Sequence, residues 1–131
     1  MKFDKSKKLL VIGRAGMDIY PEPPGTKISD VQEFSTHLGG SAANTCVALS
    51  KLGVSSDLVT CISDDAIGEY IFKKLEDFNV GSNLCRRVDK KFQTQVAVVE
   101  TILKNNQSIL YRNNSCDLQL DKEDIDKINF Q

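Results

Sequence analysis

The stretch that decides the fold of this chain reads Gly39-Gly40-Ser41-Ala42-Ala43-Asn44. Two glycines end an extended segment, and a helix of small residues is predicted to follow at once over residues 42–52, with Gly53 stopping it. Ser41 is the expected N-cap, because its hydroxyl can accept a hydrogen bond from the free amides of the first turn. Since glycine has no Cβ, a ligand is expected to lie directly against the backbone of this turn.

The start of this helix is predicted to bind a polar ligand. Its first N–H groups have no partners within the helix and carry a partial positive charge, which suits a molecule that is rich in hydroxyls or carries an anion. Asn44 lies in the same first turn, and its side chain offers one acceptor and two donors. The alternative is a tight strand-to-helix turn with an asparagine that only packs.

Length and composition indicate an ordinary globular chain. The 131 residues are enough for one domain with a real core, and 40% are hydrophobic and 27% charged. The net charge is −1 with no basic stripe, so no nucleic-acid partner is expected. Only the apolar run 9–12 follows the polar N-terminus, which is too short for a signal peptide or a membrane span, so no membrane partner is expected either.

The cysteines favour a reducing compartment. Cys46, Cys61, Cys85 and Cys116 are widely separated, and the chain holds a single histidine. This pattern supports neither a zinc site nor a disulfide framework. Four buried or half-buried free thiols in the cytoplasm are therefore expected.

Strands and helices alternate along most of the chain. Apolar runs at 8–13 and 57–62 predict buried strands, and an apolar stripe at helical spacing predicts a helix that begins at Asp64-Asp65. Short connections between such elements are typical of a parallel α/β sheet with right-handed crossovers. Because the strands expected here leave one sheet edge unpaired, we interpret the chain as the N-terminal portion of a longer protein.

Two further segments break this alternation. Residues 19–34 hold three prolines, which exclude a helix and predict short edge strands near 19–20 and 27–28. Residues 92–103 and 108–112 are predicted to pair as an antiparallel hairpin. A last short helix is expected to begin at Asp121, which would cap it.

Three motifs together resemble the ribokinase-like carbohydrate kinase family. They are LVIGRAGMD at 10–18, GGSAAN at 39–44 followed by ALSKLG at 48–53, and ISDDAIG at 62–68. The resemblance covers almost the whole chain and implies the N-terminal half of a ribokinase-like α/β domain. It also implies a small β-sheet lid over the sugar, built from about 19–38 and 92–112, and such lids often pair in homodimers.

The same resemblance bears on the reaction. It implies an ATP-dependent kinase whose catalytic aspartate, in a Gly-Ala-Gly-Asp motif, and whose binding segment for ATP and Mg²⁺ lie in a C-terminal half that is absent here. No catalytic residue is therefore expected in this chain. Within the family, GRAGMDIY at 13–20 and LYRNNSCDL at 110–118 look most like 5-dehydro-2-deoxygluconokinases of myo-inositol breakdown. 2-Keto-3-deoxygluconate kinases also carry the Tyr-Arg pair, so a keto-sugar acid phosphorylated on a primary hydroxyl is the expected substrate.

The resemblance implies four sugar contacts, Asp18, Gly39, Gly40 and Asn44. An ionised carboxylate accepts hydrogen bonds from two hydroxyls at once and can orient a sugar in this way. The alternative for Asp18 is an aspartate that caps a turn after a strand.

Two arginines, Arg112 and Arg14, are candidates for binding the carboxylate of an acidic substrate. A guanidinium fork matches a carboxylate with two parallel hydrogen bonds. For Arg14 a surface ion pair is an equally good interpretation. Thr94 is expected to line the inner face of the lid, although its strand propensity alone would also explain it.

Two other functions remain open. The chain could be a truncated, non-catalytic homologue that dimerises through its lid or senses a sugar. A nucleoside kinase of the same fold is less favoured, because apolar residues would be expected in place of the arginine pair.

Overall fold

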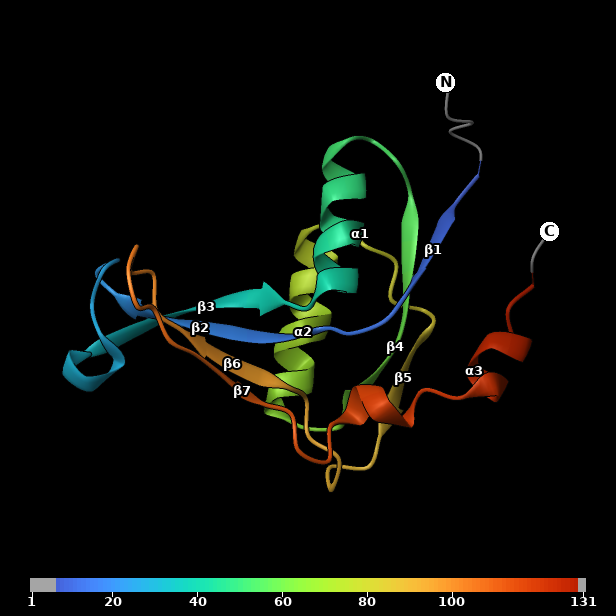
Figure 1. Ribbon diagram of the computed structural model, residues 1–131. Helices are drawn as coiled ribbons and strands as arrows, with labels where there is room; N and C mark the ends of the chain where they lie inside the picture. Colours follow the sequence, from blue (N-terminus) through green and yellow to red (C-terminus); the bar gives the residue numbers. More distant parts are fainter. Residues whose placement is uncertain (1–6, 130–131) are drawn as a thin grey trace.

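The computed structural model describes residues 7–129, which form one β-sheet flanked by helices and a second β-sheet that extends from it (Figure 1). The first sheet has the strand order β1-β4-β5, and the second has the order β3-β2-β6-β7. The strands are β1 (Leu9–Ile12), β2 (Gly16–Glu22), β3 (Glu33–Gly39), β4 (Ser56–Ser63), β5 (Cys85–Val88), β6 (Val96–Val99) and β7 (Ser108–Tyr111). The helices are α1 (Ser41–Lys51), α2 (Ala66–Asp77) and α3 (Lys122–Asp126), with 3₁₀ turns η1 (Ile28–Asp30) and η2 (Cys116–Gln119).

The first sheet is parallel, as its sequence pattern predicts. β4 lies in the middle and is buried at every position, with β1 and β5 paired to it in parallel. On one face Leu58 and Ile62 pack with residues of α1 and α2, and on the other Cys61 packs with Cys116 of η2. Burying each leucine or isoleucine contributes about 1.5–3 kcal/mol, so this three-layer core holds the fold together.

The helix starts differ in how well the sequence predicts them. Asp65 caps α2 by accepting a hydrogen bond from the Gly68 amide at 2.9 Å, and Asp121 caps α3, both as expected. The expected cap at Ser41 is wrong: the N-cap of α1 is Gly40, and no side chain caps this helix. The reason is the φ of +95° at Gly40, which turns the chain straight from β3 into α1 and makes Ser41 the first helical residue.

The second sheet corrects the expectation of short edge strands. β2 and β3 form a long antiparallel hairpin, from Gly16↔Gly39 to Glu22↔Glu33, and β2 is an inner strand of the sheet. Proline has no N–H group to donate to a neighbouring strand. Pro21 is tolerated because β2 pairs with β6 only over residues 17–19, so no hydrogen bond to β6 is needed at this position. The predicted strand near 27–28 is also wrong, since η1 begins there.

The predicted hairpin at the end of the chain is confirmed as β6 and β7, although both strands are shorter than expected. Figure 1 shows the second sheet projecting sideways from the parallel sheet and its helices. No helix among residues 7–129 has the length and apolar character that crossing a bilayer requires.

An ion pair fastens the C-terminal segment to the parallel sheet. Arg86 on β5 donates to both carboxylate oxygens of Asp124, at 2.6 and 2.8 Å, and to the Gln119 carbonyl at 2.7 Å. Because Gln119 ends η2, this pair also fixes the turn that carries Asp117.

Replacing Asp124 with asparagine is expected to weaken the fold at neutral pH and to have no effect in strong acid. The hydrogen bonds from Arg86 outweigh burial and lower the pKa of Asp124 from 3.8 to about 2. A depressed pKa gives stability that is present above the unfolded-state pKa and is lost as the pH falls through the folded-state pKa, here between about pH 4 and pH 2. We expect the substitution to lower the free energy of unfolding at neutral pH by about 1–2 kcal/mol, since solvent screens the half-exposed Arg86. Urea unfolding at several pH values measures this, and an equal deficit at pH 2 and pH 6 would contradict it.

Candidate functional site

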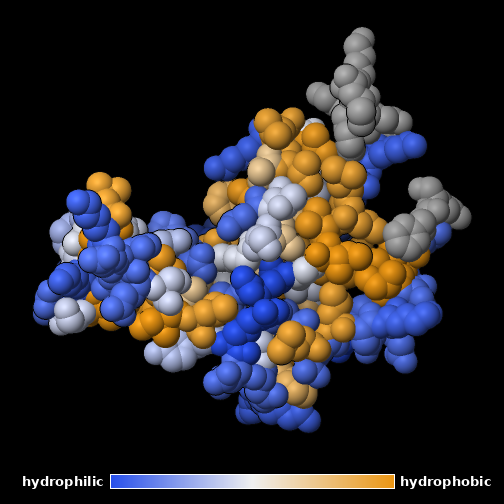
Figure 2. Space-filling view, viewed as in Figure 1, coloured by the Kyte–Doolittle hydropathy of each residue, from blue (hydrophilic) through white to orange (hydrophobic). Residues whose placement is uncertain are grey.

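The candidate site lies where the carboxyl end of β1 meets the second sheet and the start of α1. The loop after β1 lies against the helix, since the Arg14 carbonyl accepts a hydrogen bond from the Ala43 amide at 3.3 Å. Ligands of open α/β sheets bind at the carboxyl ends of the parallel strands. Figure 2 shows hydrophilic residues gathered at the junction between the second sheet and the rest of the molecule.

Asp18 lies directly over Gly39. A Cβ built on Gly39 would come within 2.1 Å of one Asp18 carboxylate oxygen, so the carboxylate occupies the volume of the missing side chain. Burial raises the pKa of Asp18 above its usual value, and the charges of Arg14 and His37 offset this only in part. The result is a partly desolvated carboxylate that can accept hydrogen bonds from hydroxyl groups.

Gly40 brings the helix start against the loop after β1. A Cβ on Gly40 would lie 2.3 Å from the Arg14 carbonyl oxygen. The space beside both glycines is thus filled by the chain itself, by Asp18 and by Arg14. That a sugar contacts the backbone of Gly39 and Gly40 from another side stays a prediction.

Asn44 stands one turn into α1. Its backbone amide donates to the Gly40 carbonyl at 2.9 Å, and its side chain is exposed. The carboxamide is therefore accessible to a ligand at the helix start.

Arg112 forms an ion pair with Asp117, a partner that the sequence pattern did not predict. Its Nη2 lies 2.6 Å from an oxygen of Asp117, whose side chain is only 6% exposed and also accepts a hydrogen bond from Ser115. Burial by itself raises the pKa of Asp117, but the hydrogen bonds from Arg112 and Ser115 and the charge of Arg14 outweigh it, so this pKa is lowered. Arg14 thus lies close enough to act on the pKa of both Asp18 and Asp117.

The two arginines keep donors that no group in the described part of the chain uses. The Nε atoms of Arg14 and Arg112 are buried and have no hydrogen-bond partner within residues 7–129. Arg112 therefore uses only part of its fork on Asp117. The remaining donors suit an anion, which is what the sequence pattern predicts for these side chains.

Thr94 was expected to line the inner face of the lid, but it lies in the interior. Its hydroxyl is buried and contacts the Ser63 hydroxyl at 2.5 Å and the Cys116 thiol at 3.5 Å, so it belongs to the interior. The neighbouring Gln95 faces the other way and lies beside Gly16. The sequence analysis overlooked this glutamine because the two residues look equivalent until the strand register is known.

The cysteines agree with the sequence analysis. Cys46, Cys61 and Cys116 are buried, Cys85 is half-buried, and all four are free thiols. Burial raises the pKa of Cys61 to about 11, so this thiol is protonated and unreactive at neutral pH. Across residues 7–129 no cluster of three or more metal-ligating side chains is found.

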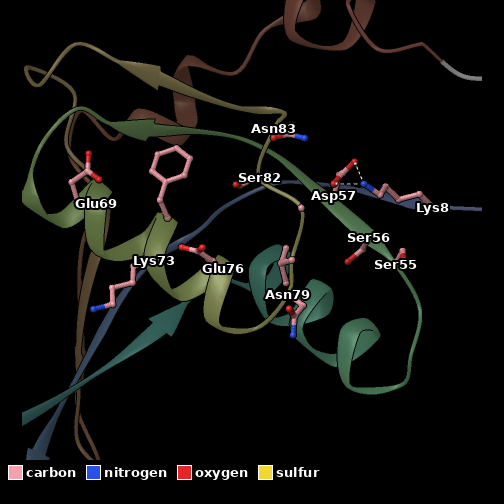
Figure 3. Close-up of a pocket in the computed structure, with 13 residues that line it drawn as sticks. Lys8, Ser55, Ser56, Asp57, Glu69, Lys73, Glu76, Asn79, Ser82 and Asn83 are labelled. Carbon is pink, nitrogen blue, oxygen red and sulfur yellow. Dashed lines mark hydrogen bonds and ion pairs between the residues drawn. The ribbon is translucent and has the colours of Figure 1, made fainter.

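A separate cavity of about 850 Å³ opens at the opposite end of the parallel strands (Figure 3). Lys8 and the start of β4 form one wall, and α2 and the loop after it form the other. Lys8 and Asp57 pair across 3.0 Å and so neutralise each other. The candidate site therefore does not coincide with this cavity.

Comparisons with known proteins agree with this arrangement. Residues 6–131 match the profile described as "pfkB family carbohydrate kinase". A 5-dehydro-2-deoxygluconokinase from Photobacterium profundum is 33% identical over 123 residues, which are 94% of this chain and 37% of that protein. A sugar kinase structure from Pyrococcus horikoshii superimposes with a TM-score of 0.79 at 28% identity, covering 90% of this chain and 38% of the other. The structure of a fructokinase with bound ATP from Xylella fastidiosa superimposes with a TM-score of 0.77 at 25% identity, covering 90% of this chain and 37% of the other. The chain thus spans less than two-fifths of the length of these relatives.

Proposed function

This chain belongs to the pfkB family of carbohydrate kinases, and we propose that it forms the sugar-binding portion of an ATP-dependent kinase for a keto-sugar acid such as 5-dehydro-2-deoxygluconate. The observation that carries the proposal is the partly desolvated Asp18 carboxylate over Gly39, close to Arg14, which also acts on the Asp117 carboxylate that holds Arg112. A carboxylate beside cationic forks fits a substrate that has both hydroxyl groups and a carboxylate.

Each side chain has a distinct task in this proposal. Asp18 accepts hydrogen bonds from sugar hydroxyls, and Asn44 binds a further hydroxyl from the start of α1. Arg112 binds the substrate carboxylate through the donors that Asp117 leaves free, and Arg14 binds it through its own unused donor. Together they fix the position of the sugar, and positioning is a large part of catalysis in phosphoryl transfer.

The second sheet acts as the lid in this proposal, with segments of about 19–38 and 92–112. A lid over the sugar would exclude water, which otherwise competes for the phosphoryl group. Phe34, Ile109 and Tyr111 are exposed, and the register places them on the face opposite Asp18. This apolar face suits pairing with the lid of a second copy.

ATP and Mg²⁺ would bind in a part of the enzyme outside these 131 residues. The chain has no Gly-Ala-Gly-Asp motif, and the residues described offer no set of metal ligands. When bound, ATP supplies the phosphoryl group. The residues of this chain bind and orient the acceptor sugar, and the free thiols fit a cytoplasmic, reducing setting.

The test is ATP-dependent phosphorylation by the protein at its full natural length. The substrates to compare are 5-dehydro-2-deoxygluconate, 2-keto-3-deoxygluconate, ribose and fructose, and the first is expected to give the highest kcat/KM. If none of the four sugars is phosphorylated, the proposal is contradicted. Sugar binding without turnover would favour the non-catalytic alternative instead.

Replacing Arg112 with glutamine is expected to raise KM for the sugar acid about 10- to 100-fold, because a hydrogen bond to a charged group contributes about 1.5–3 kcal/mol. Turnover of neutral fructose, where measurable, should change little. Arg87→Gln is the matched control, since it removes an arginine of β5 that pairs with Asp64 and Glu69 and does not contact η2. An equal loss on the acidic and the neutral sugar would contradict the role given to Arg112.

A further inference from the structure

We infer that the side-chain amide of Gln95 is a further sugar-contacting group beside the Asp18 carboxylate. The inference deepens the sugar-binding function proposed above and rests on it. Neither the sequence motifs nor the comparisons single out this residue.

The pairing of β2 with β3 places the two side chains together. Gly16 and Gly39 are directly opposite each other, and opposed residues of an antiparallel pair project from the same face of the sheet. The Asp18 carboxylate fills the place of the missing Cβ on Gly39, and the Gln95 carboxamide fills that on Gly16, where a Cβ would meet its Oε1 at 2.8 Å. Opposed Cβ positions lie about 4.5–5.5 Å apart, so one sugar can reach both polar groups.

The backbone around Gln95 fixes this orientation. The Gln95 carbonyl accepts a hydrogen bond from the Met17 amide at 3.0 Å, which joins it to β2 just before β6 begins. Ala97, two residues further on, pairs with Asp18, and residues two apart in a strand face the same way. Gln95 therefore shares the face of Asp18, whereas Thr94 points into the interior.

The amide oxygen of Gln95 lacks a partner in the part of the chain that the structure describes. The residue is 2% exposed, and its Oε1 has no hydrogen-bond partner among residues 7–129. Buried polar groups are nearly always paired, and an unpaired one costs free energy. A hydroxyl of a bound sugar would satisfy the oxygen, because the terminal torsion of glutamine is broad and lets the amide turn toward a ligand.

A carboxamide adds a capability that the other groups lack. Asp18 only accepts hydrogen bonds and the arginines only donate them, but Gln95 does both. Its Nε2 can donate to a keto oxygen while its Oε1 accepts from a neighbouring hydroxyl. Gln95 thereby helps to select a sugar with a carbonyl beside a hydroxyl.

The test compares Gln95→Met with wild type in the full-length protein. Methionine has a similar shape without the amide, so we expect KM and the calorimetric Kd for the sugar to rise about 10-fold or more. The thermal midpoint should stay the same or rise, because an unpaired buried amide is removed. A structural glutamine would give the reverse, a lower midpoint with an unchanged KM, and that result would overturn the inference.

Thr94→Val is the matched control. It removes a neighbouring buried polar group that is fully bonded, so we expect a lower thermal midpoint with KM changed by less than about threefold. A wild-type protein that binds no sugar would overturn the proposed function and this inference with it. If the wild-type protein is active and Gln95→Met binds the sugar with unaltered affinity, only the inference about Gln95 is overturned.

Discussion

Replacing Asp18 with asparagine is expected to lower kcat/KM for sugar phosphorylation about a thousandfold. In the proposed function the carboxylate, which lies over Gly39, accepts two hydroxyl hydrogen bonds, each of about 1.5–3 kcal/mol when the acceptor is charged. Two such bonds correspond to factors of about 10²–10⁴ in kcat/KM. Asparagine keeps the shape over Gly39 but loses the charge and one acceptor. Steady-state kinetics on the full-length protein measures the effect.

The same substitution is expected to stabilise the fold at neutral pH. Burial raises the folded-state pKa of Asp18, so the favourable contribution of this group is present below the unfolded-state pKa and is lost as the pH rises through the folded-state value. At pH 7 the charged form is therefore a liability that asparagine removes. Asp64→Asn is the control, since its side chain is 67% exposed and it removes the same charge. Loss of activity together with loss of stability in Asp18→Asn would show a structural role instead.

Replacing Gly40 with alanine is expected to destabilise the fold by about 3 kcal/mol or more. Two costs add: a φ of +95° is strained for alanine, and the new Cβ would lie 2.3 Å from the Arg14 carbonyl oxygen. The backbone on both sides is part of β3, α1 and the loop after β1, so neither side can move away freely. Relieving the contact would separate the helix start from Arg14, and sugar affinity should fall as well. Urea unfolding and calorimetry measure these effects.

Gly25→Ala separates the two costs. Gly25 has a φ of +93°, nearly that of Gly40, but nothing lies within 4 Å of its Cβ position. Only the conformational cost remains, and we expect about 1 kcal/mol. Equal losses of unfolding free energy in Gly40→Ala and Gly25→Ala would show that the contact with the Arg14 carbonyl does not destabilise the fold.

The parallel sheet could be predicted because its signals are local. The apolar run at 57–62 becomes the fully buried β4, and Asp65 caps the helix that follows it. The second sheet could not, because its pairing joins distant segments. Pro21 suggests an edge strand, yet β6, from almost eighty residues further along, pairs with the other end of β2 and makes it an inner strand.

The candidate site shows the same division. The glycine turn marks the place where Asp18 and the start of α1 meet, since a close approach needs residues without a Cβ. Asp117 and Gln95 carry no such mark. The roles proposed for them rest on an ion pair and on a strand register that only the folded chain reveals.

The most direct test of the account is a structure of the full-length protein with a bound keto-sugar acid. We predict sugar hydroxyl oxygens within about 2.6–3.2 Å of the Asp18 carboxylate, with the substrate carboxylate on the side of Arg112. A sugar bound instead in the cavity between α2 and the start of β4, with Asp18 left without a ligand, would contradict it.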